Sequence, residues 1–170
     1  MRTRTTALAE RFEQSNAEVI ATIEQCSEKA WLARCAAEGW SVGVTTHHIA
    51  NGYDQDGLVE QLISALVRHE PLPASAGPDY NEQHAERYAQ CTREETLELL
   101  RRNGAAAARL IRGLSDEDLD QTTPARGDRP PRSVEQILES ILLTHTSTHL
   151  ESICATIQAV EQQDSNTPPL

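Results

Sequence analysis

Residues 133–149, with the sequence SVEQILESILLTHTSTH, carry the clearest helical pattern in the chain. Apolar side chains recur there at steps of three and four, which is the spacing of an amphipathic helix. Ser133 and Gln136 have the spacing of a capping box, which closes the first turn of a helix. The stripe continues beyond His149, so the pattern predicts a long helix from residue 133 that carries His145 and His149 on its core-facing side.

The rest of the sequence is helical in the same way. Apolar stripes and caps predict long helices over residues 5–26, 41–70 and 92–112, and short helical segments over 27–31, 81–89 and 115–119. Gly52 and Gly57 weaken the middle of the second long helix and favour a kink there. Alternating runs of β-branched and aromatic residues are missing, and aromatic residues make up only 4% of the chain, so no sheet is expected. The sequence therefore predicts an all-α fold.

Two parts of the chain resemble each other. Residues 27–31 form a serine-capped turn that precedes Trp40-Ser41-Val42, and residues 115–119 form another that precedes Arg132-Ser133-Val134. In each copy a helix, a capped turn and a loop lead into a helix that begins at Ser-Val and carries histidine. The repetition indicates two helical hairpins packed together.

Length and segment composition predict one domain over residues 1–163, followed by a polar, proline-ended tail over 164–170 that frays. No run of eighteen apolar residues is present, so no transmembrane helix is expected. The N-terminus develops no apolar run and does not resemble a secretory signal. The four cysteines are scattered and form no Cys-x-x-Cys pair, which indicates reduced thiols in a cytoplasmic protein.

The charge of the chain limits its partners. Twenty-six acidic against fifteen basic residues give a net charge of −11. A nucleic-acid binder needs a basic surface to neutralise phosphates. Binding to nucleic acid is therefore not expected, and binding to an anionic membrane surface is not expected for the same reason.

Three histidines fall on the apolar faces of two predicted helices. His145 and His149 are four residues apart, which places both imidazoles on one side of a helix. His48 occupies the corresponding stripe of the helix over 41–70. Three imidazoles directed inward would be costly to desolvate unless something satisfied their nitrogens, so they are predicted to converge on one divalent metal ion. Hydrogen-bonded core histidines remain the alternative on the pattern alone.

The same residues carry a family resemblance over roughly residues 5–163. Trp40-Ser41-Val42 with His48, and Ser133 to Leu138 followed by His145-x-x-x-His149, resemble the metal-bearing helices of the DinB-like superfamily, also known as the mycothiol-dependent maleylpyruvate isomerase N-terminal superfamily. Asp79-Tyr80-Asn81-Glu82-Gln83-His84 is similar to its Asp-x-x-Asn segment.

This resemblance implies a four-helix bundle with an up-down-down-up course, which is usually a homodimer. Residues 71–91 are long enough to supply the crossover that such a course needs. It also implies a divalent ion, most often zinc or nickel, held by His48, His145 and His149 with solvent in the remaining positions. Two departures limit the analogy, because Thr148 stands where many members have a further histidine and the second domain of the isomerases is missing.

An ion with three histidine ligands and open positions is of the catalytic type. It can acidify bound water, or bind a thiol as thiolate. The leading hypothesis is a metal-dependent thiol S-transferase or isomerase-like enzyme that acts on a small-molecule substrate with a low-molecular-weight thiol such as bacillithiol, mycothiol or glutathione. The alternatives are a non-catalytic module that binds a small ligand or metal, and a metal-dependent hydrolase.

Further polar residues lie near the predicted ligands. Asn51, Gln55 and Ser152 are one or two turns away and are candidates to orient the imidazoles, with solvated polar residues at the bundle end as the alternative. Asn81 and His84 are placed at the pocket mouth by family analogy only. His47 points about 100° away from His48 around the helix and is expected to miss the ion.

Overall fold

Helices form nearly all the regular structure in the computed structural model, which describes residues 3–53, 58–68, 70, 79–122 and 130–165. They are α1 (Arg4–Glu24), α2 (Glu28–Leu32), α3 (Val42–Tyr53), α4 (Leu58–Val67), α5 (Tyr80–Arg87), α6 (Arg93–Gly113), α7 (Asp116–Asp120), α8 (Val134–Leu138), the π-helical segment η2 (Glu139–Thr144) and α9 (His145–Ser165). The described ranges contain no β-strand, only two isolated bridges, which join Arg34 to Ser41 and Thr122 to Ser133.

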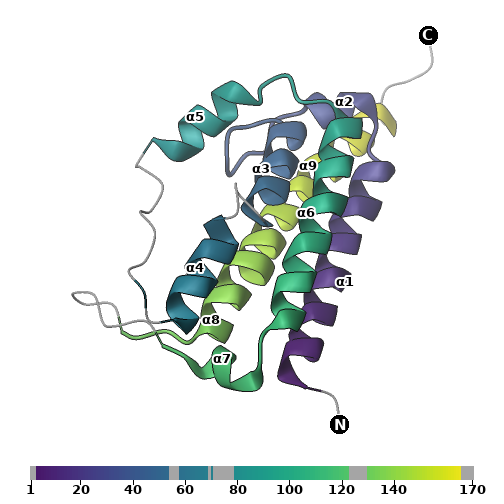
Figure 1. Cartoon of the computed structure of the whole chain (residues 1–170). Helices are drawn as coiled ribbons and strands as arrows, with labels where there is room; N and C mark the ends of the chain where they lie inside the picture. Colours follow the sequence, from purple (N-terminus) through teal and green to yellow (C-terminus); the bar gives the residue numbers. More distant parts are fainter. Residues whose placement is uncertain (1–2, 54–57, 69, 71–78, 123–129, 166–170) are drawn as a thin grey trace.

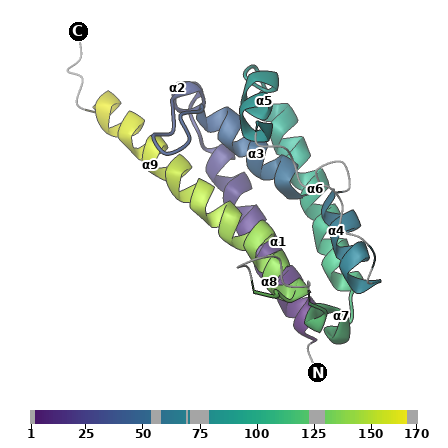
Figure 2. The same cartoon turned by 90° about the vertical axis from the view of Figure 1, so that its left-hand side faces the viewer.

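Four long helical stretches run side by side, and Figure 1 shows their directions. The chain rises along α1, descends through α3 and α4, descends again along α6 and rises through α8, η2 and α9. Helix α1 packs on α6 and α9, and α3 packs on the same two helices from the opposite side. Figure 2 shows α5 lying at the α3 end of the bundle, away from α7. The predicted all-α, up-down-down-up four-helix bundle is confirmed.

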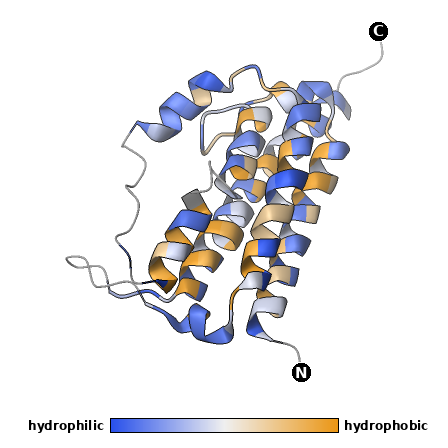
Figure 3. Ribbon diagram, viewed as in Figure 1, coloured by the Kyte–Doolittle hydropathy of each residue, from blue (hydrophilic) through white to orange (hydrophobic). Residues whose placement is uncertain are grey.

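Apolar stripes of the long helices meet in one core. The predicted stripe of α1 (Leu8, Phe12, Val19 and Ile23) is buried throughout. Large buried side chains also come from each of the other long helices, among them Ile49, Tyr53, Ile63, Leu100, Ile111, Leu138, Leu142 and Ile153. Figure 3 shows apolar and polar residues on different sides of the helices, with α5 and α7 mostly polar. In the part of the chain described, no helix is long and apolar enough to cross a membrane.

The helix starts follow from side-chain caps. The hydroxyl of Ser41 accepts a hydrogen bond from the backbone N–H of Val44 at 3.1 Å, which closes the first turn of the helix that carries His48. Complete capping boxes open α6 at Thr92 and α8 at Ser133. These caps satisfy backbone donors that a helix leaves without internal partners, and the capping box at Ser133 was predicted from the sequence.

Two predicted long helices differ in detail from the structure. The expected helix over residues 41–70 is divided into α3 and α4, and the residues between them, including Gly57, lie outside the described ranges. The expected helix from residue 133 is one helical stretch that contains the π-helical turns of η2. A π-helical segment advances the backbone hydrogen bonds from four residues to five, so side chains before η2 face a different direction than a regular helix would give them.

The repeated sequence pattern has a repeated structure. After α2, the backbone N–H of Val42 donates to the carbonyl oxygen of Ala33 at 2.9 Å. After α7, the N–H of Val134 donates to the carbonyl oxygen of Gln121, also at 2.9 Å. Each corner has a short capped helix, a single β-bridge and then a serine-capped helix that carries histidine. The corners fix where α3 and the α8–α9 stretch begin.

Candidate metal centre

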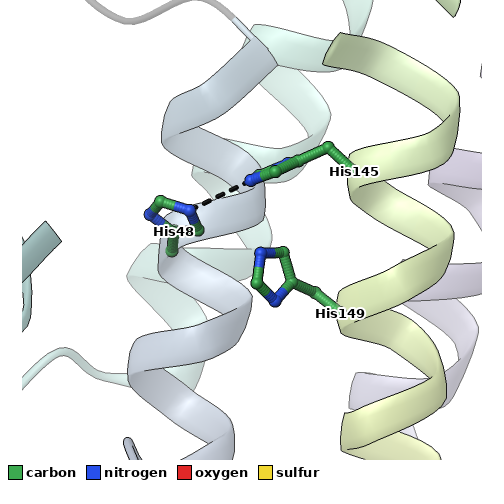
Figure 4. Close-up of side chains that lie close together, drawn as sticks. All are labelled: His48, His145 and His149. Atoms are coloured by element: carbon green, nitrogen blue, oxygen red, sulfur yellow. Dashed lines mark hydrogen bonds between the residues drawn. The ribbon is translucent and has the colours of Figure 1, made fainter. Parts of the chain in front are cut away.

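Three imidazoles from two helices converge in the middle of the bundle. His48 projects from α3, and His145 and His149 project from α9, with their rings directed toward one another (Figure 4). The Nε2 atoms of His48 and His145 are 3.0 Å apart. One ligand atom from each of the three residues lies within 4.8 Å of the others. The structure thus brings together the three histidines that the sequence analysis singled out.

The position of each ring follows from local structure. The spacing of four residues stacks the rings of His145 and His149 on one side of α9, with centroids 4.5 Å apart. α3 crosses this side of α9, and residue 48 lies on the part of α3 that is buried all round. α9 begins at His145, directly after the π-helical turns. The extra rotation of the backbone in η2 therefore sets the direction of both α9 imidazoles relative to the side chains of α8.

Burial keeps these rings neutral. Desolvation, together with the neighbouring histidines, lowers the pKa of His48 to about 3. Desolvation, with His149 nearby, lowers the pKa of His145 to about 4. Only a neutral imidazole has a lone pair for a metal. At neutral pH both rings are therefore in the form that binds a cation.

Glu38 holds the third ring. Its Oε1 accepts a hydrogen bond from Nδ1–H of His149 at 2.7 Å, and its Oε2 accepts one from the hydroxyl of Ser152 at 2.6 Å. The Glu38 side chain is only 8% exposed. Burial alone would raise the pKa of this carboxyl, but the hydrogen bonds from Ser152 and His149 outweigh that effect and lower it. An ionised Glu38 fixes the proton of His149 on Nδ1 and leaves Nε2 free to bind a cation.

Sequence reasoning did not find Glu38. It lies in the irregular segment between α2 and α3, where no apolar period marks a buried position. The one local signal is Gly39, which adopts a positive φ of 73° and turns the chain directly after the glutamate. Ser152 was a candidate to orient an imidazole, and the structure shows it acting on Glu38 rather than on a histidine ring.

His48 is held by ring packing. Its ring meets those of Trp40 and His84 edge-on, at centroid distances of 5.3 and 5.2 Å. Its Nδ1 atom is buried and has no hydrogen-bond partner among the described residues. Trp40 and His84 therefore restrict the orientation of His48 without competing for its nitrogens.

A second pair of histidines lies against this centre. Nδ1 of His47 and Nε2 of His84 are 3.4 Å apart, and His47 stacks on Tyr88 with ring centroids 3.8 Å apart. Burial lowers the pKa of both, that of His47 to about 4. As predicted, His47 faces away from the three converging rings. His84 was expected at the pocket mouth, whereas its side chain is buried between His47 and His48.

The other residues that the sequence analysis considered near the ligands lie in different surroundings. Asn51 donates a hydrogen bond from Nδ2 to the hydroxyl of Tyr80 at 2.8 Å rather than to an imidazole. Asn81 is exposed on α5, and Gln55 lies outside the described residues. Thr148 is exposed, and its hydroxyl donates to the carbonyl oxygen of Thr144 within the same helical stretch.

A cavity of about 490 Å³ opens beside two of the imidazoles. Its lining residues come from α3, α4, α5, η2 and the first turn of α9: His48, Gly52, Val59, Leu62, Tyr80, Ser140, Ile141, Thr144 and His145. The volume is within the range of small-molecule sites. A molecule in this cavity would lie directly against His48 and His145.

The residues of the cluster fit a divalent cation. Two nitrogens that bind one ion at about 2.0–2.1 Å lie about 3 Å apart or slightly more, and the nitrogens of His48 and His145 meet this distance. Imidazole suits zinc, nickel, copper and iron. The carboxylate of Glu38 behind His149 is the outer partner that histidine ligands usually have. The described residues supply three ligands here, and a site with three protein ligands leaves room for solvent or substrate.

A four-helix bundle with this course and a three-histidine cluster between α3 and α9 is an arrangement that could hold a divalent metal ion. The chain belongs to the DinB superfamily, because residues 11–153 match the sequence model of that family. The family resemblance of the motifs is thereby confirmed.

Among solved structures, the chain is similar to YfiT from Bacillus subtilis, which is described as a probable metal-dependent hydrolase with an unusual four-helix bundle topology. The two share 16% sequence identity with a TM-score of 0.74, over 93% of this chain and 88% of that chain. At this identity the likeness shows the fold. No curated protein matches the sequence at a significant level.

Proposed function

We propose that this protein is a metal-dependent hydrolase that cleaves a small, neutral ester or amide. The observation that carries the proposal is the contact between the three-histidine cluster and the cavity, since His48 and His145 belong to both. The description of YfiT as a probable metal-dependent hydrolase supports the same class of reaction.

The chain's own residues have distinct parts in this proposal. His48, His145 and His149 would hold the ion, with zinc or nickel as the metals that the family resemblance favours. A divalent ion held in this way polarises a carbonyl oxygen and lowers the pKa of a coordinated water to about 7. Glu38 fixes the tautomer of His149. The apolar side chains of Leu62 and Ile141, which also line the cavity, restrict the access of bulk water.

The thiol S-transferase or isomerase-like activity expected from the sequence is the second proposal. A three-histidine ion also binds thiolates, so the cluster is compatible with it. Bacillithiol, mycothiol and glutathione are polar molecules, however, and the described cavity residues include no carboxylate, lysine or arginine to recognise them. Hydrolysis needs no such partner, and for this reason we rank it first.

The test is turnover with and without thiol. Protein loaded with zinc or nickel is assayed on neutral p-nitrophenyl esters, alongside His48→Ala, His145→Ala and His149→Ala variants whose metal content is measured by elemental analysis. We expect hydrolysis without thiol, and a loss of metal and of rate in each variant larger than the roughly 10–100-fold that removal of an outer partner causes.

Thr148→Ala is the matched control, because Thr148 precedes a ligand but is exposed and bonds only within its own helical stretch. It should keep both metal and rate. Activity that appears only with added thiol would favour the transferase. Bound metal without turnover on any substrate would favour the non-catalytic binding module. The expected homodimer and the absence of nucleic-acid binding stay predictions.

A further inference from the structure

The cavity beside the cluster differs from most of the molecule's surface in chemistry. The chain has a net charge of −11, yet none of the described residues lining the cavity is a carboxylate, lysine or arginine. One wall is formed by the apolar side chains of Val59, Leu62 and Ile141. Figure 3 shows many apolar residues along α4 and along the neighbouring α8–η2 stretch. Such a wall cannot compensate a charged group for its lost hydration.

We infer that this cavity takes the uncharged, apolar chain of the substrate, a short acyl group, with its carbonyl directed at His48 and His145. The inference rests on the proposed hydrolase and names the class of molecule that it would cleave. The imidazoles come from α3 and α9, whereas the apolar side chains come from α4 and η2, which lie further along the bundle toward α7 (Figure 1). A bound acyl group would therefore have a polar end and an apolar end in the matching order.

The polar groups of the cavity are consistent with a neutral ligand. Tyr80, Ser140 and Thr144 present hydroxyl-bearing side chains to the space, and none is charged at neutral pH. The Tyr80 hydroxyl is held in place by Asn51. Hydroxyl groups can orient an ester or amide but give little compensation for a carboxylate. We therefore expect the charge of a ligand to affect its affinity for the cavity more strongly than its shape does.

Gly52 controls the space at the reactive end. Among the described residues, a Cβ atom at this position would meet the His145 ring, with 3.5 Å to Cε1 and 3.8 Å to Nδ1. These are ordinary contact distances, so a methyl group fits, but a longer side chain would extend into space that the cavity now offers. The absence of a side chain at residue 52 keeps the cavity open beside His145.

The experiment measures binding rather than turnover, so that its failure differs from failure of the hydrolase. Neutral N-methyl alkanamides of four to eight carbons are titrated into chelator-treated protein and followed by NMR chemical shifts. Alkanoates of the same lengths are the charged counterparts. We expect each added methylene to tighten amide binding about fourfold until the cavity is full, and alkanoates to bind at least about tenfold more weakly than the amides.

Two variants locate the binding. Gly52→Leu should weaken the longest amides by about tenfold or more, whereas Gly113→Leu, the same change at an exposed helix end with nothing within 4 Å, should not. Leu62→Ala shortens the apolar wall and should move the best chain length upward, which keeps the test decisive if Gly52→Leu does not fold.

Equal binding of amides and alkanoates, affinity independent of chain length, or equal behaviour of the Gly52→Leu and Gly113→Leu variants would overturn the inference. Amide binding without hydrolysis of any ester would overturn the proposed function and leave the cavity assignment intact. Hydrolysis without length-dependent binding would overturn the cavity assignment and leave the proposed function intact.

Discussion

Glu38 carries its charge in a place where a carboxylate is costly unless it is well bonded. Both of its oxygens are engaged, one by His149 and one by Ser152. The carboxylate therefore orients an imidazole from behind, and its removal should disturb cation binding while leaving the three ligands in place.

Glu38→Gln tests this role. The neutral amide is a weaker acceptor for the imidazole N–H, so we expect affinity for zinc to fall by about 10–100-fold, measured by competition with a chromophoric chelator. Glu151→Gln, an exposed glutamate next to Ser152, is the control and should have no effect. An unchanged affinity in the Glu38→Gln variant would show that the His149 tautomer does not depend on this carboxylate.

The neutral histidines also predict how stability depends on pH. The ordinary histidine pKa is 6.5, and folding lowers it to about 4 for His47 and His145 and to about 3 for His48. Between these values the unfolded chain binds more protons than the folded one, so stability falls as the pH falls. We expect chelator-treated protein to lose stability from pH 6.5 toward pH 4, by at most about 1.4 kcal/mol per pH unit for each such histidine.

Urea unfolding midpoints at pH 7.5, 6 and 5 check this expectation. His47→Phe keeps a ring that can stack on Tyr88 but removes one titrating group, and it should reduce the slope. A midpoint that is constant or rises toward pH 5 would contradict the assignment of neutral buried imidazoles.

The convergence of His48, His145 and His149 could be predicted, because a spacing of four residues and an apolar stripe fix the side of a helix on which a residue lies. The role of Glu38 could not. It depends on a loop whose path is set by Gly39 and by contact with α9, and neither leaves a periodic pattern in the sequence. The convergence of the three histidines on α3 and α9 was therefore predictable, and their partner from a loop was not.

At the scale of the elements, α2 and α3 meet through a glycine. A Cβ atom on Gly43 would lie 2.7 and 2.8 Å from two carbons of the Trp31 indole ring, closer than side chains normally approach. Trp31 is buried, so the ring has little room to move. The start of α3, five residues before His48, thus depends on the missing side chain.

Gly43→Ala should therefore reduce the free energy of unfolding by about 1–3 kcal/mol, even though alanine is the better helix former. In α6, Gly113→Ala is the matched control, since nothing lies within 4 Å of its Cβ position and the change should be neutral or stabilising by up to about 1 kcal/mol. Chemical denaturation measures both. Similar effects of the two substitutions would exclude close packing as the reason for Gly43.

The caps and stripes predicted the helices well, because both are local. The π-helical turns of Glu139–Thr144 were not predicted, since the shift from four-residue to five-residue hydrogen bonds changes no composition or cap. Their position is relevant to function. π-Helical turns are frequent at functional sites, and here Ser140, Ile141 and Thr144 line the cavity directly before His145.

At the scale of the whole molecule, the bundle joins two similar halves. The first provides α1, α2 and α3, and the second provides α6, α7 and the α8–α9 stretch, each with one bridged corner. The repeated Ser-Val starts predicted two hairpins, and the up-down-down-up course followed from the family resemblance. Apolar periods alone would not have given that course, because they do not specify which helices are neighbours.

The cluster spans the boundary between these halves, with His48 in one and both other histidines in the other. An ion bound to all three would bind the folded bundle and not the open chain, so binding would be coupled to folding. Above the dissociation constant, each tenfold rise in free metal would then add about 1.4 kcal/mol to stability. The amount of this protein that survives in a cell would consequently follow the local supply of metal, whether or not a substrate is present.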